Sequence, residues 1–73
     1  MKQDEIDFLI AVYSKSKDET VRDLIKRGSL PAKRCWYLLE KWSNKGWYNY
    51  GVTVDLGWLE DEGKEIAKCL LDQ

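Results

Sequence analysis

The sequence contains no histidine, and this absence excludes most of the acid–base and metal chemistry that proteins perform with imidazole. It also contains no glycine-rich phosphate loop, no HExxH motif and no CxxC motif. A chain of 73 residues that lacks these elements and any paired polar cluster is not expected to be an enzyme. We therefore expect no catalytic residue, no metal site and no cofactor.

Long apolar runs are also missing, since none approaches the roughly 18 residues that a membrane span needs. The N-terminus does not show the basic, apolar and small-residue succession of a secretory leader. The only two cysteines, Cys35 and Cys69, fall on apolar faces of predicted helices, so we expect two buried, reduced thiols. The alternative is a disulfide between them, which would need an oxidising compartment that no other feature indicates. These features predict a cytoplasmic protein without a membrane partner.

The composition itself is that of a small globular protein, with 44% hydrophobic and 34% charged residues. The length predicts a single domain over residues 1–73. A core of this size contributes little net stability, and a homodimer is expected because association would supplement it.

The longest clear helix signal runs from Leu30 to Gly46. Ser29 is placed to cap it, Pro31 suits its first turn, and Gly46 ends it. Three- and four-residue steps place one set of residues on an inward face, namely Ala32, Cys35, Leu38, Leu39 and Trp42. The same steps place a basic and polar set on the opposite face, namely Lys33, Arg34, Tyr37, Lys41 and Asn44.

Three further helices are predicted. The first spans residues 3–14, and its inward stripe is Ile6, Leu9, Ile10 and Tyr13, widened by Phe8 and Val12. This stripe either lies wholly in the core or leaves apolar surface for a partner. The second is capped by Thr20, with Asp23 completing a capping box, and ends at Gly28. The last has an acidic start at residues 60–63, with Asp61 as its cap, and continues over residues 64–71, and its inward face is Ile66, Ala67, Cys69 and Leu70.

Residues 47–59 are rich in aromatic and β-branched residues and are interrupted by Gly51 and Gly57. This composition predicts a short hairpin with strands near 47–50 and 56–59. The expected fold class is therefore mainly α with a small β-hairpin.

Charge is distributed unevenly along the chain, although the whole sequence has a net charge of −1. Residues 15–45 carry nine basic and four acidic residues, whereas both flanking segments are net acidic. A basic segment of this kind is the electrostatic pattern expected of a surface that meets phosphate, although charges of this kind also occur simply as solvated helix faces.

A short helix, a turn at residues 28–30 and a longer helix form the pattern of a helix-turn-helix, whose second helix enters the major groove. In that arrangement Arg34 could read a guanine, Lys33 could contact base or phosphate, and Lys41 and Lys45 would contact phosphate. The candidate DNA-binding residues are Arg22, Ser29, Lys33, Arg34, Tyr37, Lys41 and Lys45.

Two segments carry a resemblance to the winged-helix DNA-binding family. LLEKWSNKGW resembles the end of that family's recognition helix and the start of its wing. GWLEDEGKEIAKCL resembles the exit from the wing in MarR-like and PadR-like regulators, with Glu60 where threonine is usual. The compact size is also similar to small winged-helix proteins of phages and mobile elements. The resemblance covers essentially the whole chain and implies a winged helix-turn-helix with three helices, a two-stranded wing and a C-terminal helix.

The resemblance implies a transcriptional regulator that binds double-stranded DNA through its recognition helix at about residues 30–45. The wing departs from the family because residues 47–59 contain no basic residue. The alternative is a winged-helix module that binds a protein partner through exposed aromatic side chains of the wing or the first helix. The candidate protein-interface residues are Phe8, Tyr48 and Tyr50.

Overall fold

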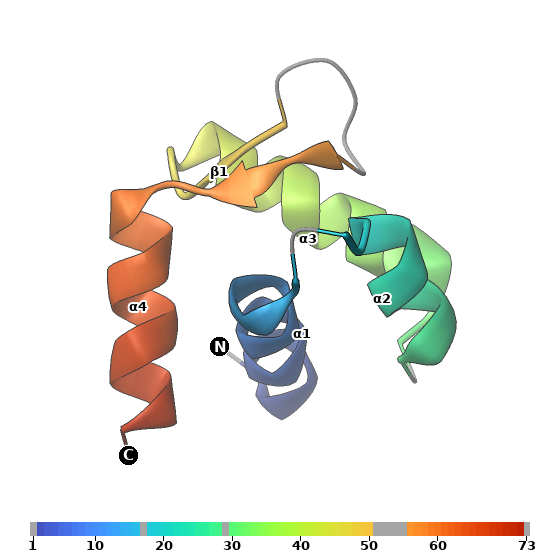
Figure 1. The fold of residues 1–73 in the computed structure, drawn as a ribbon, viewed down its shortest axis with the longest axis horizontal. Coiled ribbons are helices and arrows are strands. Elements are labelled where there is room, and N and C mark those ends of the chain that lie inside the picture. Colours follow the sequence, from blue (N-terminus) through green and yellow to red (C-terminus); the bar gives the residue numbers. More distant parts are fainter. Residues whose placement is uncertain (1, 17, 29, 51–55, 73) are drawn as a thin grey trace.

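The computed structural model describes residues 2–16, 18–28, 30–50 and 56–72, which form four helices and one small antiparallel sheet. In chain order the elements are α1 (Gln3–Ser14), α2 (Val21–Arg27), α3 (Ala32–Asn44), β1 (Tyr48–Asn49), β2 (Trp58–Leu59) and α4 (Asp61–Leu71). In Figure 1, α1 occupies the centre and is seen almost along its axis, with α4 on one side, α2 on the other and the sheet across one end. The predicted α+β class is confirmed at this level.

All four helices and the sheet contribute to the core, and the amphipathic period of α3 explains the four residues that this helix supplies. Its buried apolar residues are Phe8, Leu9, Val12, Val21, Leu24, Cys35, Leu38, Leu39, Trp42, Tyr48, Leu59 and Ala67. Four of the five predicted inward residues of α3 belong to this set. The prediction for Ala32 was wrong: it is exposed because it is the first residue of α3, and no neighbouring element covers it.

The helix α1 is rotated relative to the predicted stripe. Its buried residues are Glu5, Phe8, Leu9 and Val12. Tyr13 is exposed, and Ile6 and Ile10 are only half-buried. The rotation follows from packing, since α1 contacts α4, α2 and β2 at once and turns the line through Glu5, Leu9 and Val12 toward the core.

Both ends of α2 and the C-terminal end of α3 follow the predicted chemistry, whereas α3 begins with Pro31 as its N-cap rather than in its first turn. The Asp23 N–H donates to Thr20 Oγ1 at 3.2 Å and the Thr20 N–H donates to Asp23 Oδ2 at 3.1 Å, which completes the capping box. The latter bond lowers the pKa of the Asp23 carboxyl, so its stabilising contribution is present near neutral pH and is lost as the pH falls through that lowered pKa. Gly46 follows α3 with φ at 80°, a conformation that favours glycine.

The N-cap of the last helix lies one residue earlier than predicted. Glu60 is the N-cap of α4 and Asp61 is its first residue, because the Glu60 N–H donates to the Trp47 carbonyl at 2.7 Å and fixes the entry into the helix. Within α4, Gly63 and Ala67 are buried, whereas Cys69 is exposed. The expectation that both thiols are buried is therefore wrong for Cys69, which lies on the side of α4 turned away from the core.

The sheet has the register Tyr48↔Leu59 and Asn49↔Trp58. Because side chains alternate between the two faces, Tyr48 and Leu59 are buried while Asn49 and Trp58 are exposed. Both strands lie inside the predicted ranges and are two residues long. The proposed wing turn at residues 51–55 lies outside the described residues.

None of the four helices in the described part of the chain combines the length and the apolarity that a membrane crossing requires.

Candidate nucleic-acid interface

The outer face of α3 carries a row of exposed residues at four-residue steps. Lys33, Tyr37, Lys41 and Lys45 are all exposed, and Tyr37 retains 57% of its accessible surface. Four residues advance about 6 Å along a helix, so this row extends over roughly 18 Å. We call these four residues the basic row.

The electrostatics of the basic row are set by which cations already have partners. Among the described residues, no acidic side chain lies within ion-pair distance of Lys33 or Lys41. The ammonium of Lys45 lies 4.7 Å from the centre of the Trp47 ring, a cation–π contact that orients the side chain without neutralising it. The row therefore presents cations that are available to phosphate.

One acidic residue interrupts this face. Glu40 is exposed and, with Tyr37, Lys41, Asn44 and Lys45, lines a shallow depression on the outer side of α3. A carboxylate at this position opposes the approach of phosphate to the neighbouring lysines.

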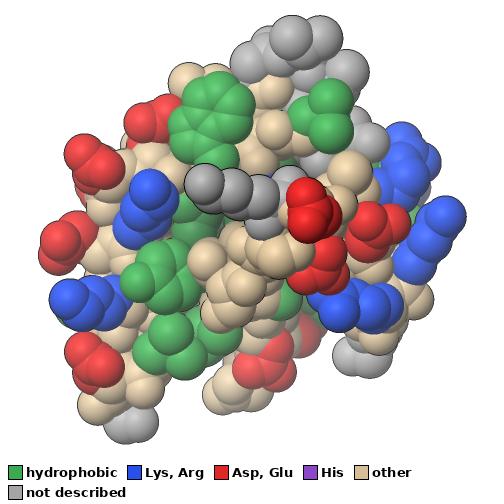
Figure 2. All heavy atoms as spheres, in the orientation of Figure 1, with side chains coloured by type: hydrophobic (Ala, Val, Ile, Leu, Met, Phe, Trp, Pro, Cys, Tyr) green, Lys and Arg blue, Asp and Glu red, His purple; other side chains and the backbone are tan. Residues whose placement is uncertain are grey.

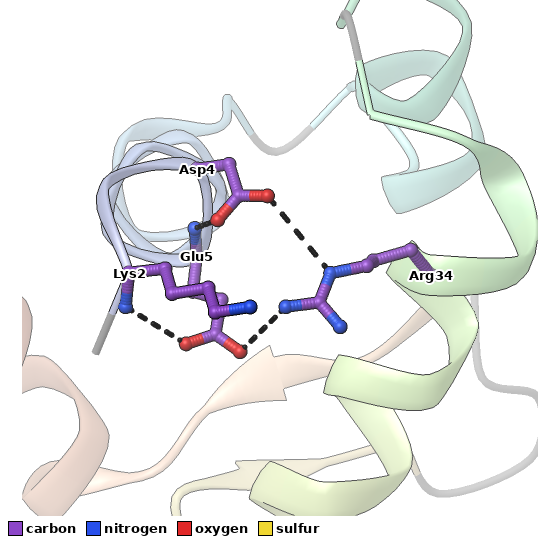
Figure 3. A network of polar contacts seen from close by, with 4 residues as sticks. All are labelled: Lys2, Asp4, Glu5 and Arg34. Carbon is purple, nitrogen blue, oxygen red and sulfur yellow. Dashed lines mark hydrogen bonds and ion pairs between the residues drawn. The ribbon is translucent and has the colours of Figure 1, made fainter.

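Arg34 differs from the rest of the predicted set because it points toward α1 (Figure 3). Its guanidinium donates to Glu5 Oε1 at 2.9 Å and lies 3.9 Å from Asp4 Oδ2. Glu5 is buried, and its second carboxylate oxygen accepts the Lys2 backbone N–H at 3.1 Å. Arg34 thus links the start of α3 to the first turn of α1, and this pairing leaves its donors directed away from the basic row.

We expect Arg34→Ala to lower the free energy of unfolding by about 1–2 kcal/mol, because it leaves the buried Glu5 carboxylate without its cation in a partly solvated pair. Lys33→Ala, its exposed neighbour, is the matched control and should change stability by less than about 0.5 kcal/mol. Urea unfolding measures both changes in stability. If α3 binds DNA, the folded Lys33→Ala variant should lose more DNA affinity than the folded Arg34→Ala variant. A stable Arg34→Ala variant that loses DNA affinity would contradict this assignment.

Arg22, another predicted DNA contact, belongs to α2 and not to the basic row. Arg22 on α2 is exposed, and its guanidinium carbon lies 5.6 Å from the centre of the Trp36 ring on α3. Ser29 lies outside the described residues. Figure 2 shows basic side chains gathered over α2 at one edge of the molecule, whereas acidic side chains are frequent over α4 at the opposite edge.

The predicted protein-interface residues are only partly at the surface. Phe8 and Tyr48 are buried, with 6% and 2% of their surface exposed, so both predictions were wrong. Phe8 stacks on Trp42 at 5.8 Å between ring centres, and Tyr48 lies on the inner face of the sheet. Tyr50 is exposed as predicted, at 36%.

Sequence reasoning missed two apolar residues that the structure exposes beside the sheet. Trp58 retains 50% of its surface and Leu56 retains 58%. The indole Nε1–H of Trp58 donates to Glu60 Oε1 at 3.0 Å, which satisfies its one donor outside the core. The alternation of side chains predicts that one strand face is exposed, but only the register Asn49↔Trp58 identifies which one.

The described residues contain no group of three or more side chains able to hold a metal ion. Comparison of the chain with protein families, with curated proteins and with solved structures finds no match.

Proposed function

We propose that the protein is a winged-helix, DNA-binding transcriptional regulator that places α3 in the major groove of double-stranded DNA. The observation that carries this proposal is the basic row on α3, in which Lys33 and Lys41 are exposed and have no acidic partner among the described residues. The lysines supply sequence-independent affinity for phosphate, and Tyr37 lies between them where it can contact bases or sugars.

The order of the elements supports the same proposal. The helices α2 and α3 contact one another across the short segment 28–31, and α3 is followed by the two-stranded sheet. This is the order of a helix-turn-helix followed by a wing. In this arrangement α2 borders the recognition helix, and its basic residues Arg22 and Lys26 are exposed.

Arg34 has a different role in this proposal from the base contact first expected of it. It holds α3 against α1 through Glu5 and makes no contact with DNA. Binding is then mainly a matter of phosphate contacts made by lysine, which predicts modest sequence specificity and a strong dependence on salt.

The experiment is fluorescence anisotropy with a labelled duplex of mixed sequence at low salt. Lys41→Ala should weaken binding several-fold, because it removes one phosphate contact. Glu40→Gln should tighten binding about two- to fivefold, because it removes a carboxylate beside Lys41. Lys68→Ala, on α4 and remote from the row, should leave the affinity unchanged. Equal effects of Lys41→Ala and Lys68→Ala would contradict the assigned face.

A homodimer is part of this proposal. Figure 2 shows hydrophobic side chains gathered along the side of α4 that faces α1, and the exposed Leu71 and half-buried Leu70 lie at the end of α4. Pairing two copies through this region would place both α3 helices outside the contact, available to DNA.

A second candidate function is a winged-helix module that binds another protein through its sheet. The specific observation in its favour is the exposure of Leu56, Trp58 and Tyr50, since tryptophan and tyrosine are enriched in protein interfaces. Trp58→Ala discriminates the two functions, because it should leave DNA affinity unchanged and abolish binding to a protein partner.

A further inference from the structure

A cavity of about 150 Å³ lies between α1, α2 and the start of α3, away from the basic row. Its wall is mostly apolar and is formed by Phe8, Ala11, Leu24, Ile25, Leu30 and Cys35. Gly28 and two acidic residues of α1, Asp4 and Asp7, complete the lining. Because Phe8, Leu24 and Cys35 are buried while Asp7 is exposed, the carboxylates lie at the mouth and the apolar groups at the base.

The base of the cavity suits an apolar group of the size of one aromatic ring. An apolar cavity of this volume is large enough to hold benzene. The thiol of Cys35 is a weak hydrogen-bonding group, and burial raises its pKa, so it stays neutral and does not attract an ion into the base. Water would find few polar partners there, which favours an apolar occupant.

The mouth of the cavity has the opposite character. Asp7 accepts a hydrogen bond from Gln3 Nε2 at 2.9 Å, and no cationic side chain of the described residues pairs with it. Asp4 lies 3.9 Å from Arg34 Nε, which leaves it only loosely paired. Negative charge at the mouth therefore complements a ligand that carries a positive charge next to its apolar group.

We propose that this cavity binds a small organic cation, with one ring or a short aliphatic chain between the three helices and an ammonium group beside Asp7. The complementarity has two parts, since the apolar base provides affinity and the carboxylate at the mouth selects the charge. The proposal does not depend on DNA binding, because no residue of the basic row lines the cavity.

The test is a titration of the ¹⁵N-labelled protein, without DNA, followed by two-dimensional NMR. The probes are 2-phenylethylamine, the neutral 2-phenylethanol and the anionic 3-phenylpropionate. We expect saturable shifts at the amides of Ala11, Leu24 and Cys35, with a roughly millimolar Kd for the amine, as is usual for ligands of so few atoms. The amine should bind about two- to fivefold more tightly than the alcohol, and the acid should bind most weakly.

Two variants separate the parts of the proposal. Asp7→Asn should remove the preference for the amine while leaving the affinity for the alcohol unchanged, whereas Asp61→Asn on α4 should change neither. Ala11→Leu should fill the cavity and abolish binding of all three probes, with the spectrum reporting that the variant is folded. The absence of saturable shifts, equal affinities of amine and alcohol for the wild-type protein, or shifts confined to α4 would each overturn the proposal.

Discussion

Trp42→Ala is expected to unfold most of the protein at 25 °C. Trp42 is 1% exposed and stacks on Phe8 with 5.8 Å between ring centres, so it fills the space between α1 and α3. Truncating a buried tryptophan to alanine costs about 3–5 kcal/mol, since transfer free energy is lost and a cavity remains. A domain of this length has only about 3–5 kcal/mol of net stability from its core, so the loss consumes nearly all of it.

The matched control for this variant is Trp58→Ala. Trp58 has the same side chain but retains 50% of its accessible surface, and its contacts lie outside the core. We expect its truncation to cost less than about 1 kcal/mol. Far-ultraviolet circular dichroism with urea titration measures both. A Trp42→Ala variant that keeps its helical signal and unfolds at the wild-type midpoint would show that the core is built differently.

Gly63→Ala is expected to destabilise the protein, although this substitution within a helix ordinarily stabilises it by about 1 kcal/mol. A β-carbon at Gly63 would overlap the carbonyl oxygen of Trp47 and lie 3.2 Å from Leu59 Cδ2. The Trp47 carbonyl cannot easily withdraw, because it accepts the Glu60 N–H at 2.7 Å and so holds the start of α4 beside the sheet. We expect a net loss of about 1–3 kcal/mol, as for overpacking of a core.

Glu65→Ala is the control for the Gly63 variant, since it is an exposed position of the same helix and should change stability by less than about 0.5 kcal/mol. Thermal unfolding of the two variants gives the sign directly. A Gly63→Ala variant that is more stable than the wild type would mean that α4 and the segment before β1 are not in close contact.

The sequence predicted the elements of the fold because their local signals are strong. In α3, Cys35, Leu38 and Trp42 recur at the helical period and are all buried. The end of α3 is equally well specified, since the Trp47 N–H donates to the Trp42 carbonyl at 2.9 Å and the Gly46 N–H to the Ser43 carbonyl at 3.1 Å. These two bonds form the C-terminal capping motif for which glycine is preferred.

The orientation of α1 could not be obtained in this way. Its apolar residues surround more than half of the helix, so the stripe through Ile6 and Ile10 and the stripe through Phe8 and Val12 are similar in composition. Only packing against the other elements decides between them. The burial of Glu5 was missed for the same reason, because its partner Arg34 is 29 positions away in the sequence.

The candidate site was predicted only in part. Periodicity correctly places Lys33, Tyr37 and Lys41 on the outer face of α3. It also placed Arg34 there, which is wrong because Arg34 points toward α1 and pairs with Glu5. Whether a position at the edge of a helical face turns outward or inward depends on the neighbouring element, which periodicity does not reveal. The cavity beneath Asp4 and Asp7 has no local sequence signal, because it arises from three helices that meet imperfectly.

The most direct test of DNA binding by α3 is the salt dependence of duplex affinity. Fluorescence anisotropy of the wild type and of a Lys33→Ala/Lys41→Ala double variant, each at several salt concentrations, gives the slope of log Kobs against log salt. We predict steep weakening with salt for the wild type and a slope shallower by about 2 for the double variant, because two phosphate contacts are lost. Failure of the wild type to bind duplex DNA at low salt, or identical slopes for the two proteins, would contradict the proposed function.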